Sequence, residues 1–386
     1  MNLDTLVRTR KLLVCVGSGG VGKTTTAAAL ALRGALTGRR TLVLTIDPAR
    51  RLANSLGLQS FGNTETRIDL GARSVPGGEL WAAMLDARGT LDDVIRKVAK
   101  DDTQRDAIFA NRIYRNIAGS FSGSQEYMAT ERLYDVYSSG RFDLIVLDTP
   151  PVKNALDFLD SPGKMTRFLD KQIMKWFLTP YEEDRVFGKR LMFGTSAVVY
   201  RLLGNIFGRE FLDELSEFFT LFRDIYDGMR DRHDAVSRIF GDGGTSFLVV
   251  SGPSEPSVDV ATFFLDELRT RRLSIGSVIV NQVHRCSPAP PDVADLLGDA
   301  VRVIDPENAG KVIARLGSAH RRLRDLAALE SGWVETLRRA ARVSTPVVEV
   351  PRRPGEVHDL PALLDLHTHL FPEHAGLRPA VAPREA

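Results

Sequence analysis

The 386-residue chain predicts an α/β fold, namely a doubly wound, mostly parallel sheet with an inserted, discontinuous helical subdomain. Two observations support this prediction. Short apolar runs alternate with helical stretches, which is typical of a parallel sheet covered by helices on both faces. Two long helical stretches, over residues 89–140 and 155–242, interrupt this alternation and divide the helical subdomain into two parts.

The elements follow in order. The sheet-forming core is expected over residues 1–88, again at 141–154, and finally over 243–371. Its strands are expected at 11–16, 41–46, 80–85, 143–148, 246–251, 277–281 and 346–350. Its main helices are expected at 23–37, 258–270 and 312–341. Residues 372–386 are rich in Pro, Ala and charge, and we expect this tail to be disordered.

The composition excludes several classes of protein. With 43% apolar and 26% charged residues the chain is typical of a soluble globular protein, and a net charge of +2 gives no electrostatic argument for nucleic acid. No apolar run approaches the roughly 18 residues that would span a bilayer. The first residues lack a signal peptide's basic and apolar regions. Two cysteines exclude a disulfide framework, so we expect a cytoplasmic protein.

A glycine-rich loop, Gly17-Ser-Gly-Gly-Val-Gly-Lys-Thr-Thr25, joins the first strand to its helix. Its spacing fits the phosphate-binding P-loop, and so does its position between a strand and a helix. Backbone N–H groups of such a loop converge on phosphate oxygens, here from Gly19, Gly20, Val21 and Gly22. Lys23 is expected to reach the β- and γ-phosphates, and the Thr24 hydroxyl to bind Mg²⁺.

Two aspartates stand at the carboxyl ends of predicted strands, where ligands of open parallel sheets bind. Asp148 follows the apolar run 144–147, which is the Walker B arrangement, and it can hold Mg²⁺ directly or through a bound water. Asp47 ends the second strand and is expected to orient the attacking water, although Asp before Pro is also a common turn element. With the loop, they predict phosphoryl transfer to water.

These motifs together resemble a known family. The loop is similar to the deviant Walker A motif, and three further segments resemble the arsenite-pump ATPases (ArsA) and their relatives, including the ATPase that delivers tail-anchored membrane proteins. Those segments are Asp47-Pro-Ala, Asp148-Thr-Pro-Pro and Val280-Asn-Gln282. The loop Ser122–Met128 is similar to the actinobacterial branch, in which two non-identical copies pair.

The resemblance implies a dimeric enzyme that binds ATP with Mg²⁺ and hydrolyses it. It implies that Asp47 is the hydrolytic carboxylate and that Asp148 lies near the metal in the second switch segment. It further implies that Asn281 hydrogen-bonds the adenine, that Pro351 flanks the base, and that Thr25 contacts the α-phosphate. Lys23 is then both a binding and a catalytic residue.

The departures from the family pattern concern the dimer. The family's signature lysine, which reaches the partner's phosphates, is replaced by Ser18, which is too short and uncharged for that role. Arg50 and Asn54 also replace the family's residues at the first switch. We therefore expect either a heterodimer with a lysine-bearing paralogue or a nucleotide-gated regulatory subunit with little turnover.

Neither zinc nor arsenite is expected. Zinc at a dimer interface would require a Cys-x-x-Cys pair from each subunit, whereas this region holds only Cys286, with His284 nearby. We expect these two residues to lie in a solvated loop. Trivalent arsenic requires a cluster of thiols, and Cys15 lies inside the first strand.

The helical subdomain leaves two interpretations open. Apolar residues recur with helical spacing over 211–229, and a second stripe spans 165–177. Such stripes pack together as a bundle core, or they line a groove for a hydrophobic client such as a membrane protein. A DNA- or membrane-positioning ATPase would instead need a basic amphipathic C-terminus, and the helical stretch 360–371 has no Lys or Arg.

Overall fold

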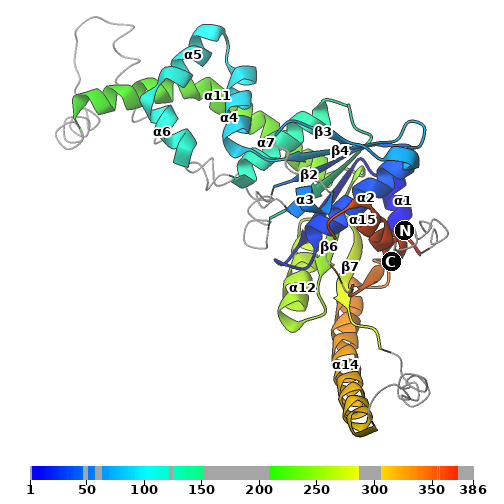
Figure 1. Cartoon of the computed structure of the whole chain (residues 1–386). Coiled ribbons are helices and arrows are strands. Elements are labelled where there is room, and N and C mark those ends of the chain that lie inside the picture. Colours follow the sequence, from blue (N-terminus) through cyan, green and yellow to red (C-terminus); the bar gives the residue numbers. More distant parts are fainter. Residues whose placement is uncertain are drawn as a thin grey trace, which may run out of the picture.

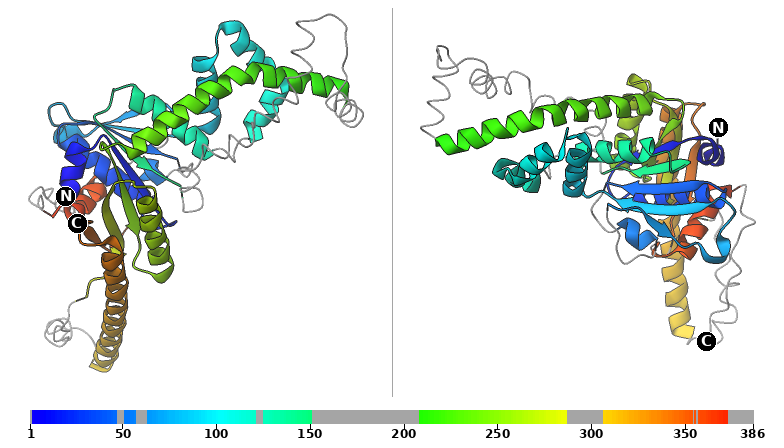
Figure 2. Two further views of the ribbon diagram at one scale, coloured as in Figure 1. Left: turned by 180° about the vertical axis from the view of Figure 1, so that it is seen from behind. Right: turned by 90° about the horizontal axis from the view of Figure 1, so that it is seen from above.

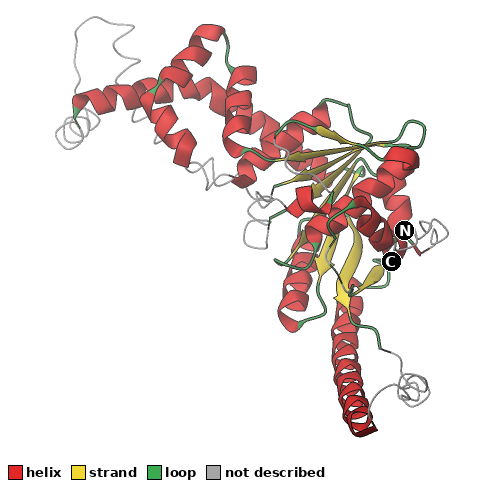
Figure 3. Cartoon of the chain, viewed as in Figure 1, coloured by secondary structure: helices red, strands yellow, loops and turns green. Residues whose placement is uncertain are grey.

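The computed structural model describes residues 2–46, 51–56, 63–120, 125–150, 208–286, 306–353, 355 and 357–372. Within these residues, eight strands form one sheet in the order β3-β4-β2-β5-β1-β6-β7-β8. Figure 3 draws the strands in yellow and the helices around them in red. The strands are β1 (Leu12–Gly17), β2 (Arg40–Thr45), β3 (Thr66–Ile68), β4 (Glu79–Met84), β5 (Leu144–Asp148), β6 (Thr245–Ser251), β7 (Ile275–Val283) and β8 (Val347–Pro351). All neighbours are parallel except β3 and β4. The predicted mostly parallel sheet is therefore confirmed.

Successive residues of each central strand point to opposite faces of the sheet, and each face is covered by helices. Leu13 and Cys15 of β1 face one side, where they join the apolar side chains of four helices. These are α1 (Leu3–Thr9), α2 (Lys23–Leu36), α3 (Arg51–Ser55) and α15 (Leu360–Leu370). The alanine-rich middle of α2 is buried, which lets this helix approach the strands closely.

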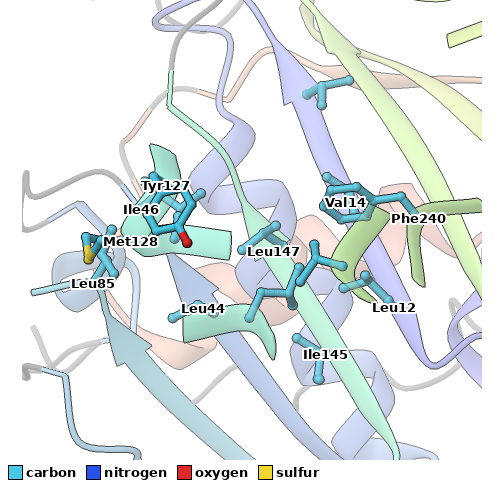
Figure 4. Packing of buried hydrophobic residues seen from close by; sticks show 14 of the residues in the cluster. Leu12, Val14, Leu44, Ile46, Leu85, Tyr127, Met128, Ile145, Leu147 and Phe240 are labelled. Carbon is cyan, nitrogen blue, oxygen red and sulfur yellow. The ribbon is translucent and has the colours of Figure 1, made fainter. Parts of the chain in front are cut away.

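The opposite face carries Leu12, Val14 and Val16 of β1, which belong to a larger apolar cluster with side chains from more helices. These are α4 (Ala87–Val98), α5 (Asp102–Ala110), α6 (Arg112–Ser120), α7 (Gln125–Ser138), α11 (Arg209–Gly241), α12 (Glu255–Thr270) and α14 (Pro306–Ala341). Figure 4 shows Tyr127 and Met128 of α7 and Phe240 of α11 among the strand side chains of this face. The fold is thus doubly wound.

Two groups of helices extend away from the sheet. Helices α4 to α7 pack with α11 on one side, and α14 projects on another (Figures 1 and 2). On α11 most apolar residues of the predicted stripe are buried, including Leu212, Phe222, Ile225 and Met229. This part of the stripe forms a bundle core. The stripe over 165–177 lies outside the described residues, and the proposed domain boundaries remain predictions.

Two elements were missed by the sequence analysis. Strand β3 has only three residues and pairs antiparallel with β4, so it offers too little pattern to recognise. Helix α1 has seven residues and is capped by Asn2, whose side chain accepts a hydrogen bond from the Thr5 backbone N–H. Outside the regular elements, residues Gly71–Arg73 form a single 3-10 turn. No helix of the described residues is long and apolar enough to cross a membrane.

Candidate functional site

The glycine-rich loop leaves β1 at Gly17 and enters α2 at Lys23, as predicted. Two of its glycines are required by close contacts. A Cβ on Gly17 would lie 2.0 Å from the Val250 carbonyl oxygen of β6. A Cβ on Gly22, whose φ is +89°, would lie 2.2 Å from Nδ2 of Asn281. The loop is therefore confined on one side by β6 and on the other by β7.

Lys23 is the first residue of α2, and its side chain turns back over the loop. Its Nζ donates a hydrogen bond to the Ser18 carbonyl oxygen at 2.8 Å, and the residue is only 7% exposed. The ammonium is thus held beside the loop backbone. Its charge and the N-terminus of α2 both favour an anion at this position.

Asp148 ends β5 and is fully buried. Its Oδ2 accepts hydrogen bonds from the Thr24 hydroxyl at 2.7 Å and from the Thr45 hydroxyl at 2.9 Å. The structure therefore brings together the two predicted metal-binding side chains, from residues 124 positions apart. Hydroxyl and carboxylate oxygens are the ligands that Mg²⁺ prefers, so this pair fits the ion.

Thr45 and Thr149 are site residues that the sequence analysis missed. Thr45 is a buried hydroxyl directly after the apolar residues 42–44 of β2, and this position at the carboxyl end of the strand was the available signal. The Thr149 hydroxyl donates to the Cys15 carbonyl oxygen at 2.7 Å and fixes the residue after Asp148 against β1. Burial raises the pKa of the Cys15 thiol far above its usual value, and the nearby Asp148 charge adds to this effect. Cys15 is consequently an inert thiol of the core.

Asn281 lies near the carboxyl end of β7, next to the loop. Its Nδ2 donates a hydrogen bond to the Val21 carbonyl oxygen at 2.9 Å. Because a primary amide has two N–H donors and a carbonyl oxygen, this bond leaves Asn281 further capacity for a base edge. Pro351 ends β8, one strand further out, where it pairs with Val283. Thr25 is half-buried on the first turn of α2.

Ser18 makes its side-chain contact within the same chain. Its hydroxyl lies 3.4 Å from the Ser257 hydroxyl on the first turn of α12, and Ser257 in turn accepts from the Ser254 hydroxyl at 3.1 Å. At 3.4 Å the Ser18 contact is a long, weak hydrogen bond. The Ser18 side chain is thus turned towards α12.

Three predicted residues of the first switch cannot be placed. Asp47 and Arg50 lie outside the described residues, and so does the side chain of Asn54. The chain before them is well defined, because the Ile46 backbone N–H donates to the Asp148 carbonyl oxygen at 3.1 Å. The first switch therefore leaves the sheet beside Asp148.

His284 and Cys286 lie in a loop, as predicted, but both residues are half-buried rather than fully solvated. His284 uses both its backbone N–H and its Nδ1 to contact the carboxylate of Glu330, each at 2.7 Å, and Glu330 is only 5% exposed. Cys286 lies 3.8 Å from the His320 ring. Helix α14 therefore anchors this segment. Among the residues that the structure describes, no cluster of three or more His, Cys, Asp or Glu side chains could hold a metal ion.

Comparison with known proteins identifies the family of this chain. Residues 10–289 match the model of the anion-transporting ATPase family, ArsA. The chain belongs to this family. It is similar to the ATPase get3 of Aspergillus terreus, with 27% identity over 72% of this chain and 74% of the relative. It is also similar to the ATPase ASNA1 homolog 1 of Paramecium tetraurelia, with 26% identity over 72% of this chain and 76% of the relative.

Membership of this family makes the protein an ATPase, and the matched residues include the glycine-rich loop between β1 and α2. The ArsA-like motifs recognised in the sequence all fall within the matched residues except the segment around Pro351. The long helix α14 begins after the matched region ends.

Proposed function

We propose that this ATPase binds ATP with Mg²⁺ at residues 17–25 and passes its nucleotide state to the helical subdomain, working as a dimer in the cytosol. The 2.7 Å contact between Thr24 and Asp148 carries the proposal. It joins the start of the P-loop helix to the end of β5, so one bound ion would be sensed by both elements.

Each side chain has a defined task in this proposal. The loop backbone from Gly19 to Gly22 binds the phosphates, Lys23 neutralises the β- and γ-phosphates, and Thr25 contacts the α-phosphate. Asn281 hydrogen-bonds the adenine, and Pro351 flanks it. Thr24 and Asp148 would hold Mg²⁺, which when bound supplies positive charge to the phosphate oxygens.

Hydrolysis needs a group that orients water, and we assign this role to Asp47. It follows Ile46, whose backbone is bonded to that of Asp148, so the two switch segments start side by side. Loss of the γ-phosphate would release both segments together. The helices that follow them in sequence would then move, and we propose that this movement controls binding of a hydrophobic protein client.

The identity of the second subunit follows from Ser18. Since serine cannot reach a partner's phosphates, a symmetric dimer would lack that charge in both sites. We propose a lysine-bearing paralogue as the partner, with a second copy of this chain as the alternative.

A second candidate function is a nucleotide-gated binding subunit with little turnover. The contact of Ser18 with Ser257 favours it, because this hydroxyl is engaged within its own chain. Retention of Lys23 and of the Thr24–Asp148 pair favours the active enzyme.

The test of the site is ATP turnover by the isolated chain and by Lys23→Ala, with Lys11→Ala as the control at the opposite end of β1. We expect Lys23→Ala to lose about two orders of magnitude in turnover, as for other charge-stabilising groups, and Lys11→Ala to be unchanged. Equal turnover in all three proteins would refute the assignment.

The test of the partner uses Ser18→Lys, with Ser18→Ala as the control that also removes the Ser257 contact. If a missing lysine limits the isolated chain, Ser18→Lys raises turnover and Ser18→Ala does not. A wild-type rate that neither Ser18→Lys nor an added paralogue increases would refute the heterodimer.

A further inference from the structure

Helix α14 is packed along only part of its length. Towards its C-terminus, Val334, Leu337 and Ala341 are at most 4% exposed and belong to the apolar core beside α12 and β7. Figures 1 and 2 show that the rest of the helix projects away from the sheet. The projecting part is the N-terminal half, in which the His320 ring lies 3.8 Å from Cys286.

The apolar face of α14 continues into this projecting half. Leu316, Leu323 and Leu326 are 46%, 37% and 39% exposed. Their spacing of seven and three residues places them on one side of a helix, in line with the buried Leu337. The projecting half thus presents to solvent the same face that the other half buries.

Basic residues border this stripe. On a helix, Arg315 and Arg322 fall on one edge of it and Arg324 on the other, and all three are exposed. Arg324 also forms an exposed ion pair with Asp325 at 3.4 Å. Residues 306–329 contain five basic side chains and two acidic ones, which gives a net charge of +3. The five are Lys311, Arg315, Arg321, Arg322 and Arg324, and the two are Glu307 and Asp325.

A second copy of this helix is a poor occupant for the stripe. Pairing two copies would set the arginines of one against those of the other, and like charges on facing helices are destabilising. The exposed stripe, from Leu316 to Leu326, is also shorter than two heptads, whereas a sustained coiled coil has three or four. An apolar stripe with arginines along both edges matches a surface that is apolar inside and anionic outside.

We propose that the N-terminal half of α14 lies in the interface of an anionic lipid membrane, with Leu316, Leu323 and Leu326 among the acyl chains and the bordering arginines at the lipid phosphates. The packed half of the helix holds this part away from the sheet. The ATPase would thereby be held at a membrane surface by a peripheral contact.

The first experiment is co-sedimentation of the full-length protein with vesicles. We expect binding to phosphatidylcholine vesicles that contain about a third phosphatidylglycerol, but not to phosphatidylcholine alone, and weaker binding as salt rises. Replacing Arg315, Arg322 and Arg324 by Ala should weaken binding about a hundredfold. Replacing Leu316, Leu323 and Leu326 by Ser should abolish it.

The matched control is Phe263→Ser, which removes an apolar side chain that is 45% exposed on α12. It should bind vesicles like the wild type, and all variants should keep wild-type ATP turnover. A second measurement needs no variant, since anionic vesicles should protect the arginines of residues 315–324 from trypsin.

Failure to bind anionic vesicles, equal loss in the Phe263→Ser control, or trypsin cleavage that vesicles leave unchanged would each overturn the proposal. Leucine variants that convert a dimer into a monomer in sedimentation velocity, without changing vesicle binding, would assign the stripe to a second copy instead.

Discussion

Replacing Gly22 by alanine tests whether Asn281 confines the P-loop. Gly22 has φ +89°, and a Cβ there would lie 2.2 Å from Nδ2 of Asn281. Gly20 provides a matched control in the same loop, because its φ is +79° but a Cβ there would meet nothing within 4 Å. The two alanine variants therefore share backbone strain, and only one has the clash.

The magnitudes follow from these contacts. An alanine in the left-handed region costs roughly 1–2 kcal/mol, and both variants should lose this much stability. Gly22→Ala must also displace the Asn281 amide and break its hydrogen bond to Val21, which adds about 1–2 kcal/mol. We therefore expect Gly22→Ala to be destabilised by about 1–2 kcal/mol more than Gly20→Ala.

The assay is urea unfolding of the nucleotide-free protein, with a double mutant to complete the cycle. In an Asn281→Ala background the clash is absent, so Gly22→Ala should cost no more than Gly20→Ala does in the wild type. If Gly20→Ala and Gly22→Ala are equally destabilised in the wild type, Asn281 does not confine the loop and the reasoning fails.

Three further predictions concern Asp148, His233 and Glu330. Asp148→Asn removes the buried negative charge beside the Thr24 and Thr45 hydroxyls. ATP turnover should fall about a hundredfold, with a smaller loss of affinity for a fluorescent ATP analogue. Unchanged turnover would show that Asp148 is not part of the site. His233 is 3% exposed and stacked on Tyr127, and burial lowers its pKa from 6.5 to about 4. The unfolded chain therefore binds the proton more tightly, so stability is complete above pH 6.5 and is lost as pH falls towards 4. His233→Phe should reduce the difference in unfolding free energy between neutral and acid pH by on the order of 2 kcal/mol, measured by urea unfolding at both pH values. If the free energy of unfolding of the variant depends on pH as in the wild type, the assignment to His233 is contradicted. Glu330→Gln should lower the free energy of unfolding by about 1–2 kcal/mol, because the Glu330 carboxylate contacts both the backbone N–H and the ring of His284, directly after β7. Glu335→Gln, on the exposed face of the same helix, should change it by less than about 0.5 kcal/mol, and equal effects would argue against an anchoring role.

The sheet and the glycine-rich loop could be predicted because each is recognisable from a short, continuous stretch of sequence. Each central strand is a continuous apolar run, since parallel strands are buried on both faces, and the glycine spacing of the loop is set by backbone geometry alone. Asp148 was recognised for the same reason, as a carboxylate directly after such a run.

The partners of these residues could not be predicted, because they depend on register. Thr45 reaches Asp148 only because β2 and β5 are neighbours paired at these two residues. Glu330 reaches His284 across 46 positions, by way of a helix whose position beside β7 has no local signature. The sequence therefore predicted the loop at His284 but not its contact with α14.

The hydroxyl of Thr149 determines how the residue after Asp148 is held. Its bond to the Cys15 carbonyl oxygen, together with the Thr149 backbone N–H on the same oxygen at 3.3 Å, fastens the residue after Asp148 to the central strand. Because both bonds end on one carbonyl oxygen of β1, the sheet is in effect extended by one residue beyond the end of β5.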